Sequence, residues 1–503
     1  MHLGLDIGTS GVKGLLMTED FGVVASCGAE LTVSRPKTGW AEQDPDDWIA
    51  AVRSVIDGLR ASFPEAFSAL RSIGLSGQMH GAVLLDENDR VLRPCILWND
   101  SRSHSECAEL EVRAPFRETG GNIVMPGFTA PKVRWVEKHE PEVFRRIRKV
   151  LLPKDYVRLW LTGEHVAEMS DAAGTLWLDV AHRRWSPELL SATNLTEAQM
   201  PRLVEGTEKS GALRAELAGE WGIARVPVAG GGGDNAATAC GMGVVRPGTG
   251  FVSLGTSGVL FAACDCYSPN TEQALHTFCH AVPGLWHHMG VILAAVDSLA
   301  WLGRVTGHSA PDLTAMLPDR ISRPAASVFL PYLSGERTPH NLPWPAGTFA
   351  NLSMSTELPD MVQAVLEGVS YAFLDCKAAL EAAGTRLDRA FVVGGGARCS
   401  QWREILSSVC GIELLVPKSG DFGAAYGAAK LGVACLADGA LEDIITVPEV
   451  DLVIRPDPML QDAYAERFAE FSGLSGRVRT NTSEFRPASK SGLDQKSGRA
   501  QAT

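Results

Sequence analysis

The same five residues, Gly-Thr-Ser-Gly-Val, occur twice in this 503-residue chain, at 8–12 and at 255–259. Each copy lies between two short apolar runs, which predicts a strand, a tight turn and a second strand in each half of the protein. A turn of this composition exposes several backbone N–H groups and hydroxyls at one point, which suits an anionic oxygen. We therefore expect two phosphate-type turns on duplicated lobes, placed to hold the two ends of one polyphosphate. The alternative is a coincidence of two ordinary hairpin turns.

Two carboxylates accompany this pattern. Asp6 lies on the strand before the first turn, where it either caps backbone N–H groups or holds Mg²⁺ through water beside bound phosphates. Asp234 follows a predicted strand at 226–229 and four glycines at 230–233, and it begins a predicted helix. It is either the N-cap of that helix or a base that accepts a proton from a bound hydroxyl. The second interpretation rests on a helix N-terminus that keeps the carboxylate ionised and on glycines that let a ligand approach.

Three consecutive glycines, Gly394, Gly395 and Gly396, repeat this arrangement in the second half. They follow a predicted strand at 390–393 and precede a helical stretch at 400–410. A plain turn between a strand and a helix needs one glycine at most. We therefore expect a flat base or sugar to pass over this backbone, with a plain turn as the alternative.

The segment 77–81, Gly-Gln-Met-His-Gly, follows an apolar run in the first half. Gln78 and His80 fall on the same side of the chain between two glycines, which suits recognition of a polyol. The segment at 97–102 adds Trp98 and several polar groups, as sugar sites commonly do. The alternative for His80 is a hydrogen-bonded structural residue.

The elements that must position these residues alternate between strand and helix, which predicts an α/β fold. Apolar residues recur at helical spacing in 361–380 and Gly384 follows them, so we expect a helix that stops there. We expect an N-terminal lobe over 1–245 and a C-terminal lobe over 246–471. From residue 472 the chain turns polar with almost no apolar periodicity, and we predict a disordered tail over 472–503.

Composition argues against several classes of protein. The net charge of −13 is unlike that of a nucleic-acid-binding protein, which needs a concentrated basic face. The 11 cysteines show no metal-binding pattern and no targeting segment precedes the first strand, so we expect reduced thiols and a cytoplasmic protein. No apolar run approaches the ~18 residues of a membrane span. The motifs of P-loop ATPases, dinucleotide-binding dehydrogenases, protein kinases and α/β-hydrolases are absent from the sequence.

Long segments of the chain resemble the FGGY family of carbohydrate kinases, and within it the bacterial xylulokinases. The resemblance extends to about residue 469 and rests on the segments 6–13, 77–81, 97–100, 128–132, 152–156, 171–175, 253–259 and 330–340. The chain departs from the family pattern at Asn351, where the family usually has glycine. Because asparagine tolerates a left-handed backbone, we expect this turn to survive.

The resemblance implies two actin-like lobes of ribonuclease-H type around a catalytic cleft, with sugar mainly on the first lobe and ATP mainly on the second. It implies that Asp234 is the catalytic base and that Asp6 is a catalytic residue that helps hold the metal, which we expect to be Mg²⁺. The implied sugar contacts are Met79, His80 and Asn99. The implied nucleotide contacts are Thr9, Ser10, Lys13, Thr256, Gly395 and Gly396.

These observations together predict transfer of the γ-phosphoryl group of ATP to D-xylulose, giving D-xylulose 5-phosphate. Phosphoryl transfer needs positioning and charge neutralisation more than covalent help. The alternatives are an FGGY kinase for another ketopentose or polyol, and an actin- or chaperone-like ATPase switch. The segments 77–81 and 97–100 favour a kinase, because an ATPase switch has no need of a polyol pocket. The expected partner is a small sugar, with no nucleic acid and no membrane, and a homodimer is allowed.

Overall fold

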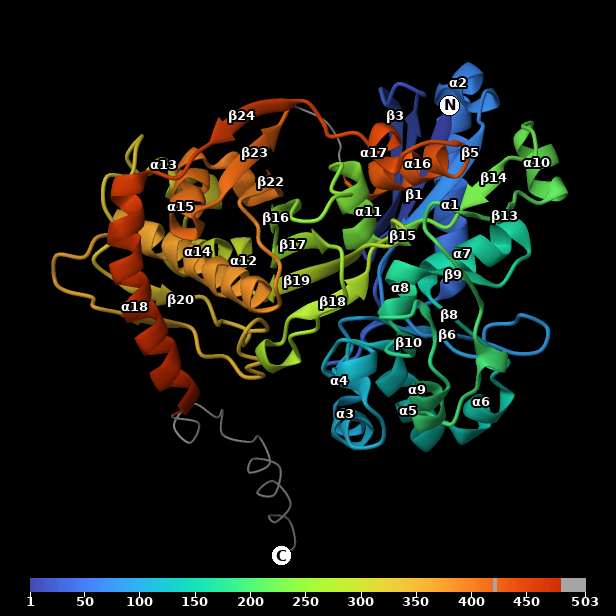
Figure 1. Cartoon of the computed structure of the whole chain (residues 1–503), viewed down its shortest axis with the longest axis horizontal. Coiled ribbons are helices and arrows are strands. Elements are labelled where there is room, and N and C mark those ends of the chain that lie inside the picture. The colour runs from blue at the N-terminus through green and yellow to red at the C-terminus, as the bar shows by residue number, and fades with distance from the viewer. Residues whose placement is uncertain (419–422, 481–503) are drawn as a thin grey trace, which may run out of the picture.

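The computed structural model describes residues 1–418 and 423–480, which form two seven-stranded sheets with helices packed around them (Figure 1). The first sheet has the order β13-β14-β5-β1-β2-β3, and β15 pairs with β5 beside this path. Its strands are β1 (His2–Ile7), β2 (Gly11–Met17), β3 (Val23–Glu30), β5 (Ser72–Gly77), β13 (Lys209–Ala212), β14 (Pro227–Ala229) and β15 (Gly232–Gly233).

The second sheet has the order β18-β19-β17-β16-β22-β23-β24. Its strands are β16 (Gly250–Leu254), β17 (Gly258–Cys264), β18 (His276–Cys279), β19 (Trp286–Ile292), β22 (Arg389–Val393), β23 (Glu413–Pro417) and β24 (Val450–Ile454). Smaller strand pairs are β4 (Glu42–Gln43) with β7 (Cys95–Ile96), β6 (Val83–Leu85) with β8 (Lys149–Leu151), β9 (Val166–Glu168) with β12 (Arg202–Val204), β10 (Leu178–Asp179) with β11 (Arg184–Trp185), and β20 (Val328–Leu330) with β21 (Thr348–Ala350).

Both predicted strand–turn–strand units are present, one in each sheet. β1 and β2 are antiparallel up to the pair Ile7 and Val12, and β16 and β17 are antiparallel up to Leu254 and Gly258. The first strand of each hairpin also pairs in parallel with a later strand, β5 in the first sheet and β22 in the second. The repeated sequence therefore marks a repeated structural unit.

Helices surround both sheets. Those of the first half are α1 (Pro45–Ser62), α2 (Pro64–Ser68), α3 (His104–Glu111), α4 (Phe116–Thr119), α5 (Thr129–His139), α6 (Pro141–Arg146), α7 (Pro153–Thr162), α8 (Met169–Ala173), α9 (Pro187–Ala192), α10 (Ala215–Trp221) and α11 (Asp234–Gly241). Those of the second half are α12 (Val296–Thr306), α13 (Ala310–Ala315), α14 (Leu358–Ala382), α15 (Ser400–Cys410), α16 (Ala424–Ala434), α17 (Leu441–Ile444) and α18 (Pro458–Thr480).

Local signals explain where these helices begin and end. The Asp44 side chain caps α1 by accepting from the N–H of Asp46, and Pro45 stands at the first helical position. The predicted helix over 361–380 is confirmed as α14, and Gly384 follows it in a left-handed conformation. The predicted helix at 400–410 is confirmed as α15.

Helix α16 corrects the expected division of the chain into lobes. This helix belongs to the segment 246–471, yet it packs on the first sheet beside β1 and β5 (Figure 1). A Cβ on Gly4 would lie 1.8 Å from the carbonyl oxygen of Ala425, and one on Gly74 would lie 1.7 Å from that of Ala428. The two glycines remove the side chains that would keep a helix away from the sheet. The second half of the chain therefore completes the first lobe.

Helix α18 corrects the expected start of the polar tail. It continues to Thr480, so residues 472–480 are helical, whereas residues 481–503 of the predicted tail lie outside the described residues. Phe471 packs against the ring of Tyr332 at 6.3 Å, and Ser475 shares a 3.0 Å hydrogen bond with the Tyr332 hydroxyl. Buried Phe471 and Val478 lie two turns apart on one face, which is a helical spacing within a polar segment.

The turn at Asn351 forms as expected. Asn351 has a φ of 62°, which is the left-handed conformation that asparagine tolerates. Its side-chain amide donates to the carboxylate of Glu470 on α18 at 3.1 Å. Asparagine in place of the family's usual glycine therefore fits this turn.

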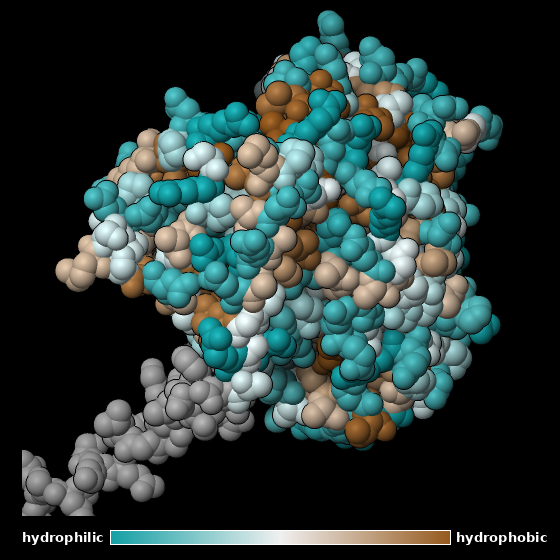
Figure 2. Space-filling model, turned by 60° about the vertical axis from the view of Figure 1, so that its left-hand side comes forward, coloured by the Kyte–Doolittle hydropathy of each residue, from teal (hydrophilic) through white to brown (hydrophobic). Residues whose placement is uncertain are grey.

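The outer surface is mixed in polarity. Figure 2 shows hydrophilic side chains over much of one face, with hydrophobic side chains in small patches between them. Within residues 1–418 and 423–480, no helix is both long and apolar enough to cross a membrane.

Candidate active site

Asp6 and Asp234 approach one another at the carboxyl ends of neighbouring strands in the first sheet. Asp6 of β1 pairs with Ser76 of β5 on one side, and Gly232 of β15 pairs with Ser76 on the other. Asp234 follows β15 directly, after Gly233. The parallel strands β1, β5 and β15 thus bring the two carboxylates to one edge, the edge at which α/β sheets bind their ligands.

The charge state of Asp234 depends on this arrangement. Burial first, and the nearby carboxylate of Asp6 second, raise the pKa of its carboxyl from 3.8 to about 6. The main-chain N–H and side-chain amide of Asn235 donate to Asp234 Oδ1 at 2.7 Å and 2.9 Å and offset part of this effect. The ionised form therefore predominates at neutral pH, with a pKa that burial and the charge of Asp6 raise above the ordinary value.

The N-cap interpretation of Asp234 is not what the helix shows. Gly233 occupies the N-cap position of α11, and no side chain caps this helix end. Asp234 is instead the first helical residue, and its carboxylate bonds only to its neighbour Asn235 among the described residues. Within residues 1–418 and 423–480, the other carboxylate oxygen thus has no protein donor, which suits a group that receives a proton from a ligand.

The surroundings of Asp6 suit a carboxylate that binds a cation. Its Oδ1 atom is buried without a hydrogen-bond partner in the described part of the chain. Burial raises the pKa of Asp6, while the Ser76 hydroxyl and the Lys13 ammonium lower it. A buried carboxylate oxygen without a donor fits a cation or its bound water. No group of three or more His, Cys, Asp or Glu side chains forms a metal site among the described residues, so a cation here needs water or phosphate oxygens as its other ligands.

The four glycines before Asp234 serve the packing of the chain. A Cβ on Gly230 would lie 2.1 Å from the carbonyl oxygen of Glu205, and one on Gly231 would lie 2.1 Å from that of Leu75. A Cβ on Gly233 would lie 2.9 Å from the Met79 side chain. The prediction that these glycines leave room for a ligand is corrected: they let neighbouring backbone and Met79 come close.

The two repeated turns present unpaired backbone donors. In the described residues, the N–H groups of Thr9 and Ser10 have no hydrogen-bond partner, and neither do those of Thr256 and Ser257. Carbonyl oxygens of the second turn are held by the start of α12, where the N–H of Ala295 donates to Thr256 at 3.0 Å. Such exposed N–H groups are a suitable surface for phosphate oxygens.

A chain of hydrogen bonds connects the first turn to the polar segments found in the sequence. The indole of Trp98 donates to the Thr9 hydroxyl at 3.0 Å, and that hydroxyl donates to Gln78 at 2.9 Å. The Gln78 amide donates to Gln43 at 2.9 Å, and the Gln43 amide donates to the Thr9 carbonyl at 2.8 Å. The hydroxyl of Thr9 therefore already uses its proton, and Gln78 acts within this ring of hydrogen bonds.

The side chains of Met79 and His80 lie over Gly174, and that of Met79 also lies near Gly233, the residue before Asp234. A Cβ on Gly174 would lie 2.9 Å from Met79 Cε and 2.7 Å from His80 Nδ1, so both side chains lie over this glycine. His80 Nδ1 donates to the Gly174 carbonyl at 2.7 Å, and Lys132 donates to the His80 carbonyl at 2.7 Å. Burial lowers the pKa of His80 to about 3, so the imidazole is neutral and its Nε2 atom is an acceptor. The ring packs edge-on to Phe128 with 4.7 Å between centroids.

The remaining predicted residues occupy different environments. Asn99 is exposed beside Trp98, and Lys13 of β2 pairs with Asp6 across the sheet. A Cβ on Gly395 would meet nothing within 4 Å, whereas one on Gly396 would lie 3.0 Å from Leu254 and Trp402 side chains. Of these two glycines, Gly395 is the one with open space above its backbone.

Comparison with known proteins identifies the family of this chain. The model of the FGGY family of carbohydrate kinases, N-terminal domain, matches residues 1–241, and that of the C-terminal domain matches residues 250–436. The chain belongs to the FGGY family of carbohydrate kinases. The xylulose kinase of Escherichia coli (strain K12) is 46% identical over 477 residues, which cover 94% of this chain and 98% of the relative. The xylulose kinase of Klebsiella pneumoniae is 44% identical over 482 residues, or 95% of this chain and 99% of the relative.

Solved structures show the same fold. A xylulose kinase from Brucella ovis is 53% identical and superposes with a TM-score of 0.93, covering 95% of this chain and 99% of that one. The xylulose kinase from Rhodospirillum rubrum is 30% identical with a TM-score of 0.88, covering 95% and 99%. The predicted two-lobed, actin-like α/β fold of this FGGY kinase is therefore confirmed.

Sequence reasoning missed a buried ionic cluster beneath the site of this FGGY kinase. The Lys154 ammonium lies 2.7 Å from Asp155, 3.6 Å from Glu168 and 3.3 Å from Asp171, and all four side chains are inaccessible to solvent. Arg158 joins the cluster through Asp155 at 3.6 Å. The signal was present, because these residues fall within or beside the family segments 152–156 and 171–175.

The same cluster holds the end of β14 and the start of the glycine run before Asp234. The Arg158 guanidinium donates to the carbonyl oxygens of Ala229 at 2.7 Å and of Gly230 at 2.5 Å. On the other side of the glycine run, the Gly233 N–H donates to the Ser170 hydroxyl at 3.1 Å. Both ends of the turn before Asp234 are therefore fixed by buried side chains.

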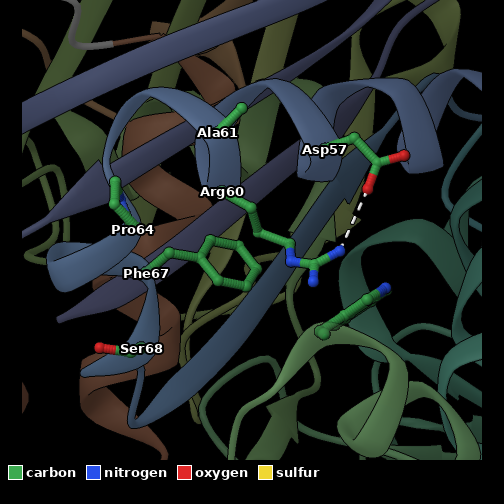
Figure 3. Close-up of a pocket in the computed structure, with 7 residues that line it drawn as sticks. Asp57, Arg60, Ala61, Pro64, Phe67 and Ser68 are labelled. Atoms are coloured by element: carbon green, nitrogen blue, oxygen red, sulfur yellow. Dashed lines mark hydrogen bonds and ion pairs between the residues drawn. The ribbon is translucent and has the colours of Figure 1, made fainter.

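A separate surface pocket lies between α1, α2 and α10, with a volume of about 390 Å³ (Figure 3). In this pocket, Arg60 points toward Asp57, and their side chains form an ion pair at 3.3 Å. Its lining residues are Asp57, Arg60, Ala61, Pro64, Phe67, Ser68 and Trp221, none of which belongs to the predicted site.

Proposed function

We propose that this FGGY kinase transfers the γ-phosphoryl group of ATP to the 5-hydroxyl of D-xylulose. The observation that carries the proposal is the pair of carboxylates, Asp234 and Asp6, at the strand ends beside Met79 and His80. The similarity to xylulose kinases along almost the whole chain supports the choice of sugar.

Asp234 acts as the base in this proposal. Its pKa of about 6 leaves the carboxylate ionised at neutral pH and keeps it basic enough to accept a proton from the sugar hydroxyl. Asp6 helps to bind the metal ion, because its buried Oδ1 atom has no protein donor in the described residues. Mg²⁺, when bound, neutralises charge on the transferring phosphates.

The two repeated turns hold the phosphates. The N–H groups of Ser10 in the first turn and Thr256 in the second are open to phosphate oxygens, and Lys13 adds a positive charge beside Asp6. Gly395 leaves space for the adenosine. Met79, His80 and exposed Asn99 are the proposed sugar contacts.

Metal identity is tested by titration. We expect turnover in Mg²⁺ to be abolished by chelation and restored by added Mg²⁺, and we expect Asp6→Ala to need a higher Mg²⁺ concentration. Equal activity of this variant and the wild type at limiting Mg²⁺ contradicts the metal role of Asp6.

We also propose that the enzyme works in a reducing cytoplasm. All 11 cysteines are free thiols, and most are buried. Sedimentation velocity then distinguishes the homodimer allowed by the sequence from a monomer.

The proposed reaction is tested by coupled ADP release with D-xylulose, D-ribulose, xylitol and glycerol, and with no sugar. We expect the highest kcat/KM for D-xylulose and slow ADP release without sugar. A higher kcat/KM for another sugar assigns the protein to the alternative of a different FGGY specificity. ADP release that does not change when sugar is added supports an ATPase switch instead.

A further inference from the structure

A loop of the second lobe places the cationic side chain of Arg337 against the first lobe. The backbone of this loop is fixed against the end of β19: the Thr338 N–H donates to Val291 at 3.1 Å, and the Val291 N–H donates to the Thr338 hydroxyl at 3.1 Å. Two residues before Thr338, the Glu336 carboxyl group accepts from the N–H of Leu293 at 3.0 Å. Arg337 lies between these two anchors, so the position of its backbone is well determined.

The side chain of Arg337 reaches the residues around His80. Its Nη1 atom contacts the sulfur of Met125, a residue of the first lobe. Three residues further on, the ring of Phe128 packs 4.7 Å from His80 and 5.8 Å from His276. The charge of Arg337 lowers the pKa of both histidines, in addition to the larger effect of burial. The guanidinium therefore lies close to the sugar side of the site.

The donors of this guanidinium are poorly used by the protein. Among residues 1–418 and 423–480, its only side-chain hydrogen-bond acceptor is the Met125 thioether, which is a weak acceptor. The adjacent Glu336 is a poor counter-ion, because burial raises its pKa to about 8 and favours the neutral acid. A half-buried guanidinium with unused donors is costly unless a ligand oxygen completes it.

The order of side chains along the site shows which end of a ligand meets Arg337. Asp234 follows Gly233, and a Cβ on Gly233 would touch Met79 at 2.9 Å. Met79 and His80 lie side by side over Gly174. A sugar whose reacting hydroxyl is at Asp234 therefore extends past Met79 toward His80, and its far end approaches the guanidinium.

The far end of a 2-ketopentose matches these groups chemically. When the 5-hydroxyl is at the base, the C2 carbonyl and the C1 hydroxyl lie at the opposite end. A carbonyl oxygen only accepts hydrogen bonds and a guanidinium only donates them, whereas neutral His80 offers Nε2 as an acceptor for a hydroxyl.

We propose that Arg337 determines specificity for a ketose by donating from the second lobe to the C2 carbonyl oxygen of the sugar. This inference rests on the proposed function, because it assumes that the 5-hydroxyl is placed at Asp234. It gives the second lobe a direct contact with the sugar as well as with the nucleotide.

The test compares a ketose with the pentitol that lacks the carbonyl. We measure kcat/KM for D-xylulose and for xylitol, together with the KM for ATP, in the wild type, Arg337→Gln and Arg337→Lys. Because a hydrogen bond to a charged donor is lost, the preference for D-xylulose over xylitol should fall about 10–100-fold in Arg337→Gln, with the KM for ATP unchanged. Arg337→Lys should retain an intermediate preference. Arg320→Gln, an exposed arginine of the same lobe that pairs with Asp457, is the matched control and should behave as wild type.

Several outcomes overturn the inference. An unchanged ratio of D-xylulose to xylitol in Arg337→Gln does so, as does an equal loss for both sugars or an effect on the KM for ATP alone. If melting curves show that Arg337→Gln is unfolded, the ratio in Arg337→Lys decides, and a wild-type ratio there refutes the contact. If the wild type itself does not phosphorylate D-xylulose, the proposed function fails, which is a separate result from a failure of Arg337.

Discussion

The pH dependence of turnover tests the electrostatics of the carboxylate pair. A base must be deprotonated to act, so kcat/KM for the sugar should rise through the pKa of Asp234 and reach a plateau above it. That pKa is raised from 3.8 to about 6 by burial first and by the charge of Asp6 second. At one pH unit below the midpoint, we therefore expect about one tenth of the plateau value.

A substitution at Asp6 separates these two causes. In Asp6→Asn the negative charge beside Asp234 is removed, so the pKa of Asp234 should fall and the acidic limb should move to lower pH. Burial remains in this variant and is the larger cause, so the midpoint should stay above the ordinary value of 3.8.

The assay is a stopped-time measurement of ADP formation between acidic and neutral pH, at the same Mg²⁺ concentration for both enzymes. Far-UV circular dichroism at each pH confirms that the enzyme remains folded. A wild-type midpoint near 4, or a limb that moves to higher pH in Asp6→Asn, refutes the reasoning.

Three further predictions concern recognition, stability and motion. His80→Ala should raise the sugar KM about 5–100-fold through a lost hydrogen bond, and a change in the KM for ATP alone contradicts its assignment to the sugar. Arg158→Met breaks a buried ion pair and two bonds to the strand before Asp234, so urea unfolding should show a loss of about 3–5 kcal/mol; a loss below about 1 kcal/mol argues against this role. Sugar and an ATP analogue together should lower the radius of gyration in small-angle scattering, because lobe closure excludes water, and identical curves with and without both ligands count against closure.

Much of the fold was predictable because its signals are local. The turns at 8–12 and 255–259 lie between alternating apolar runs, and both form the hairpins expected of them. The apolar spacing within 361–380 likewise determines α14. The position of Asp234 at the start of α11 was also predictable, because the preceding strand and glycines are adjacent in sequence.

The features that were missed depend on contacts between distant segments. Gly4 and Gly74 admit α16 to the first sheet, but nothing near these glycines in sequence identifies that helix. The same limit applies to Gly230, whose space is filled by Glu205 backbone and not by a ligand. The pKa of Asp234 depends on its burial and on Asp6, which lies far from it in sequence, so its raised value could not be predicted from the helix start alone.

The central claim is that Asp234 is the base in phosphoryl transfer to the sugar, and Asp234→Asn tests it most directly. Asparagine preserves the shape of the side chain and removes the proton acceptor, so kcat should fall about 10²–10⁴-fold. Calorimetry on the same preparation should show D-xylulose binding within a few-fold of wild type, because the contacts at Met79 and His80 remain. Loss of turnover with retained sugar binding is the predicted result, and turnover of Asp234→Asn near the wild-type rate contradicts the account.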